Sequence, residues 1–201
     1  MSSEPVSSDL YASSDFWEDN KTKILAYGIL LIVVLGGYGI YFVNSQRKEA
    51  AAKANYAAAS SAAELQAVVR DYAGSRVAGD ASLQLADKLR EEKKYGEAET
   101  VLLDFIAKNP DHPLVGGAWI SLASTYEFKG KLDKALDTYQ QAATKFPNAY
   151  TAPIALVSQG RILIEQKKPD DAKRIYEDVV ARYPDSIFAR ESMRELRFLK
   201  R

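Results

Sequence analysis

From about residue 79 onward, the same types of residue recur every 37 positions along this chain. Three columns keep that interval: Pro110, Pro147 and Pro184; Ala98, Ala135 and Ala172; Leu102, Tyr139 and Tyr176. Chance is a poor explanation for three independent columns in one register. Periods of 20 to 50 residues are typical of solenoids, in which each unit buries its apolar face against the next. The sequence therefore predicts an array of similar units.

The middle unit, from Gly116 to Pro147, shows what each unit contains. Apolar residues spaced i, i+3, i+4 and i+7 mark one face of a first helix: Trp119, Leu122, Ala123 and Tyr126. Gly130 ends that helix, and the second helix stops before Pro147. The inner stripe of this second helix is formed by Ala135, Tyr139 and Ala142. Each unit is thus predicted to be a pair of helices that cross closely at small residues.

These residues stand where the signature residues of the tetratricopeptide repeat stand, so the unit resembles that family. The resemblance implies an all-α chain whose C-terminal part is a tetratricopeptide-like (TPR-like) α-solenoid covering 64–201. Its units are about 79–115, 116–152 and 153–189, with half-repeat helices at the two ends and a capping helix at 187–201. Three units are the usual minimum for a stable stack.

Residues 24–43 form a run of 20 residues without a charge. As a helix this run is about 30 Å long, which matches the hydrocarbon core of a bilayer. A single N-terminal transmembrane helix is predicted, following a short polar tail at 1–23 and preceding a helical stalk at 44–63. A buried core helix is a weaker alternative, because nothing else in the chain is apolar enough to surround the run. A cleaved signal peptide would have a shorter apolar region followed closely by small residues.

The flanks of the run leave its orientation open. Lys21 and Lys23 precede it, and Arg47, Lys48 and Lys53 follow it, so positive charges are nearly balanced across the predicted span. In the alanine-rich segment that follows, the residues beyond Tyr56 are expected to pack on the first repeat.

No pattern for catalysis or cofactor binding is found. The chain has no cysteine and a single histidine, His112, in an Asn-Pro-Asp-His-Pro loop where a solvated or capping role is expected. No GxGxxG or P-loop pattern occurs, and the glycine cluster Gly36-Gly37-Tyr38-Gly39 lies in the apolar run, where no phosphate could be reached. Basic and acidic residues number 27 each, without a basic block, which argues against nucleic-acid binding. We therefore expect no enzyme activity, cofactor or metal.

The resemblance implies instead a protein-binding groove lined by the first helix of each pair. By register, the candidate groove residues are Leu83, Asp87, Arg90, Ile120, Ser124, Glu127, Phe128, Val157, Arg161 and Ile164. Exposed apolar residues beside charges would suit an amphipathic helix or an extended segment of a partner. Burial of some of them under the stalk or by self-packing is the alternative. The lysine and asparagine clamp that some members use for a chaperone's C-terminal carboxylate is missing, since Leu83 and Asp87 occupy the matching positions.

The whole layout also resembles the YfgM-like family of ancillary Sec translocon subunits. The likeness is closest in Phe16-Trp17-Glu18-Asp19-Asn20-Lys21, in the apolar run, and in the alanine-rich Gln46–Ser61. It implies a single-pass protein of the bacterial inner membrane with a periplasmic repeat domain. Its expected partners are Sec translocon subunits and periplasmic chaperones, besides the lipid bilayer around 24–43. The function implied is an adaptor that assists protein translocation or hands chains to chaperones.

Two other classes of function are compatible with a repeat array. One is a scaffold for envelope assembly or cell division, like the periplasmic repeat proteins of the Tol-Pal and outer-membrane assembly systems. Many of those carry a lipid on a cysteine, which this chain lacks. The other is an enzyme with the repeats as an accessory module, for which the array leaves no room.

Overall fold

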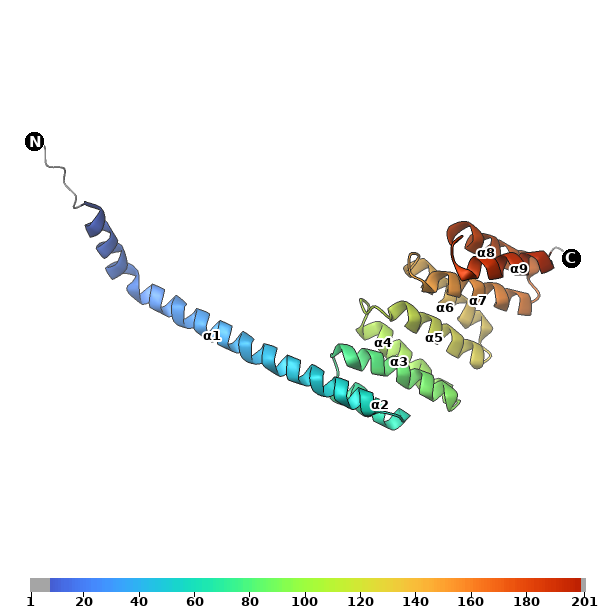
Figure 1. Ribbon diagram of the computed structural model, residues 1–201, viewed down its shortest axis with the longest axis horizontal. Coiled ribbons are helices and arrows are strands. Elements are labelled where there is room, and N and C mark those ends of the chain that lie inside the picture. Colours follow the sequence, from blue (N-terminus) through green and yellow to red (C-terminus); the bar gives the residue numbers. More distant parts are fainter. Residues whose placement is uncertain (1–7, 200–201) are drawn as a thin grey trace, which may run out of the picture. The chain divides into compact units, whose positions relative to one another are not determined.

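The computed structural model describes residues 8–199, with side chains from Asn20 onward, and its regular secondary structure in that range is entirely α-helical (Figure 1). The helices are α1 (Ser8–Ala58), α2 (Ala62–Asp71), α3 (Arg76–Glu91), α4 (Tyr95–Lys108), α5 (Val115–Phe128), α6 (Leu132–Lys145), α7 (Thr151–Glu165), α8 (Pro169–Arg182) and α9 (Ile187–Leu199). The start of the predicted polar tail (1–7) and the last two residues of the predicted capping helix lie outside the described residues.

The chain divides into two compact units, the first ending at Ala50 and the second beginning at Ala51. This boundary lies within the segment predicted as a stalk. In the first unit, α1 carries the apolar run, and every side chain from Ile24 to Val43 is exposed. Apolar side chains therefore project on all sides of this helix. It is long and apolar enough to cross a membrane.

The second unit is a stack of helix pairs, each helix packing on the next in chain order (Figure 1). The pairs are α3 with α4, α5 with α6, and α7 with α8, while α2 and α9 stand at the two ends. The first helices of successive pairs also touch one another: α3 contacts α5, α5 contacts α7, and α7 contacts α9. Within the described chain, the second helices α4, α6 and α8 have no Cα atoms within 8 Å of one another, so they lie farther apart than the first helices do. Neighbouring pairs therefore lie closest together along their first helices, which we call the closed side of the array, and are more widely spaced along their second helices. The predicted TPR-like solenoid is confirmed.

Small residues set the distance between the two helices of a pair. Ala86, Ala123 and Gly160 occupy the same position in successive first helices, and all three are buried. A Cβ atom added to Gly160 would lie 2.5 Å from Cε1 of Tyr176 on α8. The close crossing of the two helices, which the sequence predicted, thus requires a small residue at this position.

The turn inside each pair uses one left-handed residue. Gly130 has a φ of 69°, and the residues 37 positions before and after it, Lys93 and Lys167, each have a φ of 60°. Left-handed backbone costs a residue with a Cβ atom more than it costs glycine. The turn geometry is therefore repeated even where the sequence does not supply glycine.

The N-terminal end of the array starts within α1 rather than after it. Ala52 is fully buried and Tyr56 is half-buried, both against a core that includes Leu65 and Val68 of α2. Between the helices, the Ser61 hydroxyl accepts from the Glu64 backbone N–H, while the Glu64 carboxylate accepts from the Ser61 N–H. This capping box starts α2.

The solvated or capping role expected for the single histidine differs from what the structure shows: its ring is buried, and the N-cap position of α5 is Leu114, without a side-chain cap hydrogen bond. The His112 side chain is 8% exposed and packs edge-on against the Phe105 ring, with 5.1 Å between ring centroids. Its Nδ1 accepts a hydrogen bond from the Leu114 backbone N–H. The loop between the first two pairs is wrapped tightly enough to bury the ring beside Gly79.

Candidate protein-binding groove

The predicted groove residues lie on α3, α5 and α7, the helices that face the closed side of the array. The structure separates them by exposure. Leu83, Ile120 and Val157 are half-buried and pack against the main core. Asp87, Phe128, Arg161 and Ile164 are exposed, while Arg90, Ser124 and Glu127 are intermediate. The exposed and intermediate residues form the accessible part of the predicted groove.

An aromatic platform lies at the C-terminal end of α5. The ring of Phe128 stacks on Tyr95 of α4, with centroids 5.5 Å apart and planes 3° from parallel. The Arg90 guanidinium of α3 lies 5.6 Å from the centroid of the Phe128 ring. Phe128 is 57% exposed although it is held by these two neighbours. A large apolar side chain is thus presented to solvent in a fixed orientation.

The guanidinium of Arg90 is itself held by polar contacts. Its Nη1 donates to Oδ1 of Asp87 at 2.9 Å and to Oγ of Ser121 at 3.0 Å, so it joins α3 to α5. Nε of Arg90 is buried and has no hydrogen-bond partner among the described residues. Cation–π contact with Phe128 is therefore part of a network that positions the platform before any partner binds.

Glu127, one of the predicted groove residues, joins three helices. Its Oε1 accepts from the Tyr139 hydroxyl of α6 at 2.5 Å, and its Oε2 accepts from Nη2 of Arg161 on α7 at 2.5 Å. Burial, with a smaller contribution from Glu127, raises the pKa of the Tyr139 phenol well above its ordinary value. The phenol therefore stays protonated and acts as a donor. Arg161 is 60% exposed and leaves a cationic group on the surface.

A further ion pair crosses the same end of the array. Lys129, which follows α5, pairs with Glu99 of α4, and this hydrogen bond is the main cause that lowers the pKa of the Glu99 carboxyl. Tyr95, Glu99, Ser121 and Tyr139 were not among the predicted groove residues. Tyr139 stands in a repeat column, but its pairing with Glu127, like that of Tyr95 with Phe128, follows from helix crossing and not from spacing along the chain.

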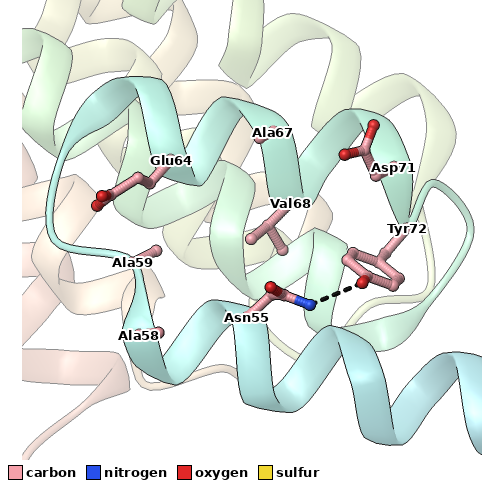
Figure 2. Close-up of a pocket in the computed structure, with 8 residues that line it drawn as sticks. All are labelled: Asn55, Ala58, Ala59, Glu64, Ala67, Val68, Asp71 and Tyr72. Atoms are coloured by element: carbon pink, nitrogen blue, oxygen red, sulfur yellow. Dashed lines mark hydrogen bonds between the residues drawn. The ribbon is translucent and has the colours of Figure 1, made fainter.

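A separate cleft of about 280 Å³ lies at the N-terminal end of the array, between the end of α1 and α2 (Figure 2). Nδ2 of Asn55 donates to the Tyr72 hydroxyl at 2.7 Å and so bridges the two sides of the cleft (Figure 2). Ala58, Ala67 and Val68 also line it. Across residues with described side chains, no group of three His, Asp or Glu residues is placed to hold a metal ion.

Comparison with known proteins defines the family. The family model described as the tetratricopeptide repeat-like domain matches residues 14–194. The chain belongs to the tetratricopeptide repeat-like domain family. The match begins before the apolar run, so it includes that run as well as the repeats. Domains of this kind generally mediate protein–protein interaction. The search of curated proteins found no match.

Solved structures with the same fold include several repeat proteins. A tetratricopeptide repeat protein from Parabacteroides merdae is 19% identical (TM-score 0.55), over 69% of this chain and 52% of that protein. This chain thus spans about half of that protein's length. A putative kinesin light chain with TPR-like repeats from Podosopora anserina is 16% identical (TM-score 0.56), over 77% and 84% of the two chains. BtubC from P. vanneervenii is 17% identical (TM-score 0.54), over 77% and 65%. These likenesses support the fold alone.

Proposed function

We propose that this chain is a membrane-anchored adaptor that binds other proteins through the groove on α3, α5 and α7. The observation that carries the proposal is the Phe128 side chain, an exposed aromatic ring that stacks parallel to Tyr95 and lies beside the Arg90 guanidinium. Aromatic side chains that are already ordered lose little conformational entropy on binding, and they are typical of the residues that dominate binding energy in interfaces. Ile164 and the exposed Arg161 extend this surface along α7.

The anchoring part of the proposal rests on the exposure of the apolar run. Every residue from 24 to 43 is exposed on α1. Transfer of one large aliphatic or aromatic side chain out of water is worth about 1.5–3 kcal/mol, so about 20 residues in water carry a large unfavourable free energy. Insertion into a bilayer removes it, because the helix satisfies its own backbone hydrogen bonds.

The cellular setting is proposed from the resemblance to the ancillary Sec translocon subunits. In this setting, residues 24–43 span the bacterial inner membrane and the repeats lie in the periplasm. The partners are translocon subunits or periplasmic chaperones, and the chain assists translocation or hands emerging chains onward. It acts by binding alone, without catalysis or a cofactor. One family model that covers both the apolar run and the repeats supports a tether and a binding array acting together.

Membrane extraction and reporter fusions test the anchor. We expect the full chain to resist extraction by alkaline carbonate, and replacement of Leu30, Ile32 and Val34 by Asp to release it into the supernatant. Alkaline phosphatase fused after Arg201 is expected to be active. Green fluorescent protein fused at the same place is expected not to fluoresce, because it does not mature when it is exported through the Sec translocon. A fluorescent fusion with inactive phosphatase would place the repeats in the cytoplasm and contradict the translocon setting.

Photo-crosslinking identifies the partner. A photoreactive amino acid placed at Ile164 in the full chain, irradiated in intact membranes, is expected to capture translocon subunits or periplasmic chaperones. A position on α8 that is exposed on the opposite side, Glu177, serves as the matched control. Capture of division or outer-membrane assembly proteins, with no translocon subunit or chaperone, would favour the envelope scaffold instead.

A further inference from the structure

A cleft of about 400 Å³ opens on the side of the array opposite to the predicted groove. Its walls come from α6 and α8, which both pack on α7 and, within the described chain, have no Cα atoms within 8 Å of each other. It is lined by Gln140, Ala143, Thr144, Pro147, Leu156, Gln159, Ile175 and Arg182. At one end the Tyr183 hydroxyl donates to the Pro147 backbone carbonyl at 2.8 Å, which ties the two walls together. The cleft is therefore already formed before any ligand binds.

Gln159 on α7 lines this cleft and is 4% exposed. Its Nε2 is buried and has no hydrogen-bond partner among the described residues. Buried amide groups without a partner are costly and therefore rare in folded proteins. The last torsion of a glutamine side chain is broad, so the amide can turn its N–H groups toward the cleft at little cost.

The other repeats show that the fold does not require a polar residue here. The positions 37 and 74 residues before Gln159 are Leu122 and Leu85, and both leucines are buried. Leu85 lies in the equivalent cleft between α2 and α4, which has a volume of about 320 Å³. Leucine is the residue that this position holds in the two other repeats. Gln159 therefore gives the cleft between α6 and α8 a buried hydrogen-bond donor, where the cleft between α2 and α4 has Leu85.

The lining indicates the chemistry of the ligand. Ala143, Pro147, Leu156 and Ile175 are apolar, and the cation at the rim, Arg182, is paired with Asp178 at 2.8 Å. A charged ligand would gain little from that neutralised rim, whereas an uncharged carbonyl matches the orphaned N–H of Gln159. We propose that this cleft binds a short, uncharged segment of a partner polypeptide, whose carbonyl oxygen accepts from Gln159 while its apolar side chains contact Leu156 and Ile175. This second site rests on the proposed protein-binding function.

The test begins with a phage library of random seven-residue peptides selected on the full chain in detergent micelles. Selected peptides are synthesised with fluorescein, and their dissociation constants are measured by fluorescence anisotropy. Three variants are compared with the wild type. Gln159→Leu installs the residue of the other repeats, Thr144→Tyr fills the mouth of the cleft from the exposed side of α6, and Phe128→Ala alters only the predicted groove. Leu85→Gln in the equivalent cleft is the matched control.

We expect one class of peptides to bind at least about tenfold more weakly to Gln159→Leu and to Thr144→Tyr, and equally well to Phe128→Ala and Leu85→Gln. Gln159→Leu is also expected to melt at a higher temperature than the wild type, so its loss of binding cannot be a loss of folding. Peptides that depend on Phe128 but not on Gln159 or Thr144 would overturn the cleft and keep the proposed function. Selection of no peptide that depends on either site would overturn both. Selection of the Gln159-dependent class, with no peptide that depends on Phe128, would keep the cleft and overturn the groove.

Discussion

The backbone of Gly160 on α7 lies directly against the ring of Tyr176 on α8. A Cβ atom at residue 160 would lie 2.5 Å from Cε1 and 2.6 Å from Cζ of that ring. Tyr176 is 3% exposed, so its ring is packed on nearly all sides and has little room to move away from residue 160. The third helix pair therefore crosses at a distance that only glycine permits.

Gly160→Ala is expected to lower the free energy of unfolding by about 1–3 kcal/mol, because the added methyl group forces the two helices apart. Urea unfolding of the full chain in detergent, followed by circular dichroism, measures this change. The matched control is Gly96→Ala on α4, where the added Cβ has no atom within 4 Å beyond its chain neighbours and the backbone of its own helix. That variant is expected to gain up to about 1 kcal/mol, as alanine usually does over glycine in a helix. Equal effects of the two substitutions would contradict the close crossing.

Removal of the central carboxylate of the groove is expected to cost more than removal of its exposed partner. Glu127→Ala leaves the buried Tyr139 hydroxyl without its acceptor and should lower the free energy of unfolding by about 1–3 kcal/mol. Arg161→Ala removes a group that is 60% exposed and should cost no more than about 1 kcal/mol. Urea denaturation of both variants gives the comparison. A larger loss from Arg161→Ala would mean that the ion pair, not the phenol, holds Glu127.

The capping box of α2 predicts that part of the chain's stability is lost in acid. Backbone hydrogen bonds from Ser60 and Ser61 lower the pKa of Glu64 from 4.5 to about 2 in the folded chain. A carboxyl with a lowered folded pKa stabilises the fold fully above its unfolded pKa, and this contribution is lost as the pH falls from about 4.5 toward 2. Glu64→Gln should remove that part of the pH dependence. Unfolding of both proteins across this pH range measures it, and parallel curves would show that the box does not form.

The left-handed residue in the turn of each pair predicts whether two reciprocal substitutions raise or lower the free energy of unfolding. Lys167→Gly replaces a side chain at a φ of 60°, and should raise the free energy of unfolding by up to about 1 kcal/mol. Gly130→Lys at the equivalent turn should lower it by a similar amount. Thermal unfolding of both variants is sufficient, because the two shifts are expected to have opposite signs. Shifts of the same sign would show that the two turns are not equivalent.

The 37-residue columns were enough to predict the helix pairs. Leu122, Ala123 and Tyr126 follow the helical period, and all three are buried in the structure. The groove was predicted less completely from the same register. Leu83 and Val157 share its face, yet both pack against the core because neighbouring first helices touch one another there. Helical periodicity identifies a face but not the width of the contact that covers it.

Side-chain pairs between helices are the part that the sequence could not supply. The Glu127–Tyr139 bond and the Phe128–Tyr95 stack join residues on different helices, and both depend on the crossing geometry. The break between α1 and α2 did have a local signal. Ser61-Ala-Ala-Glu64 is a capping-box sequence, and it marks the start of α2 inside the alanine-rich segment.

Photo-crosslinking from Phe128, compared with Leu103, tests the central claim most directly. Both side chains are large, apolar and about half exposed, at 57% and 46%, but Phe128 belongs to the groove and Leu103 lies on the second helix α4. A photoreactive residue is placed at each position in the full chain, and intact membranes are irradiated. The account predicts a discrete protein adduct from position 128 that is absent from position 103 and is lost when Arg90 is replaced by Ala. The same adducts from both positions, or none from position 128, would contradict a groove that binds a protein partner.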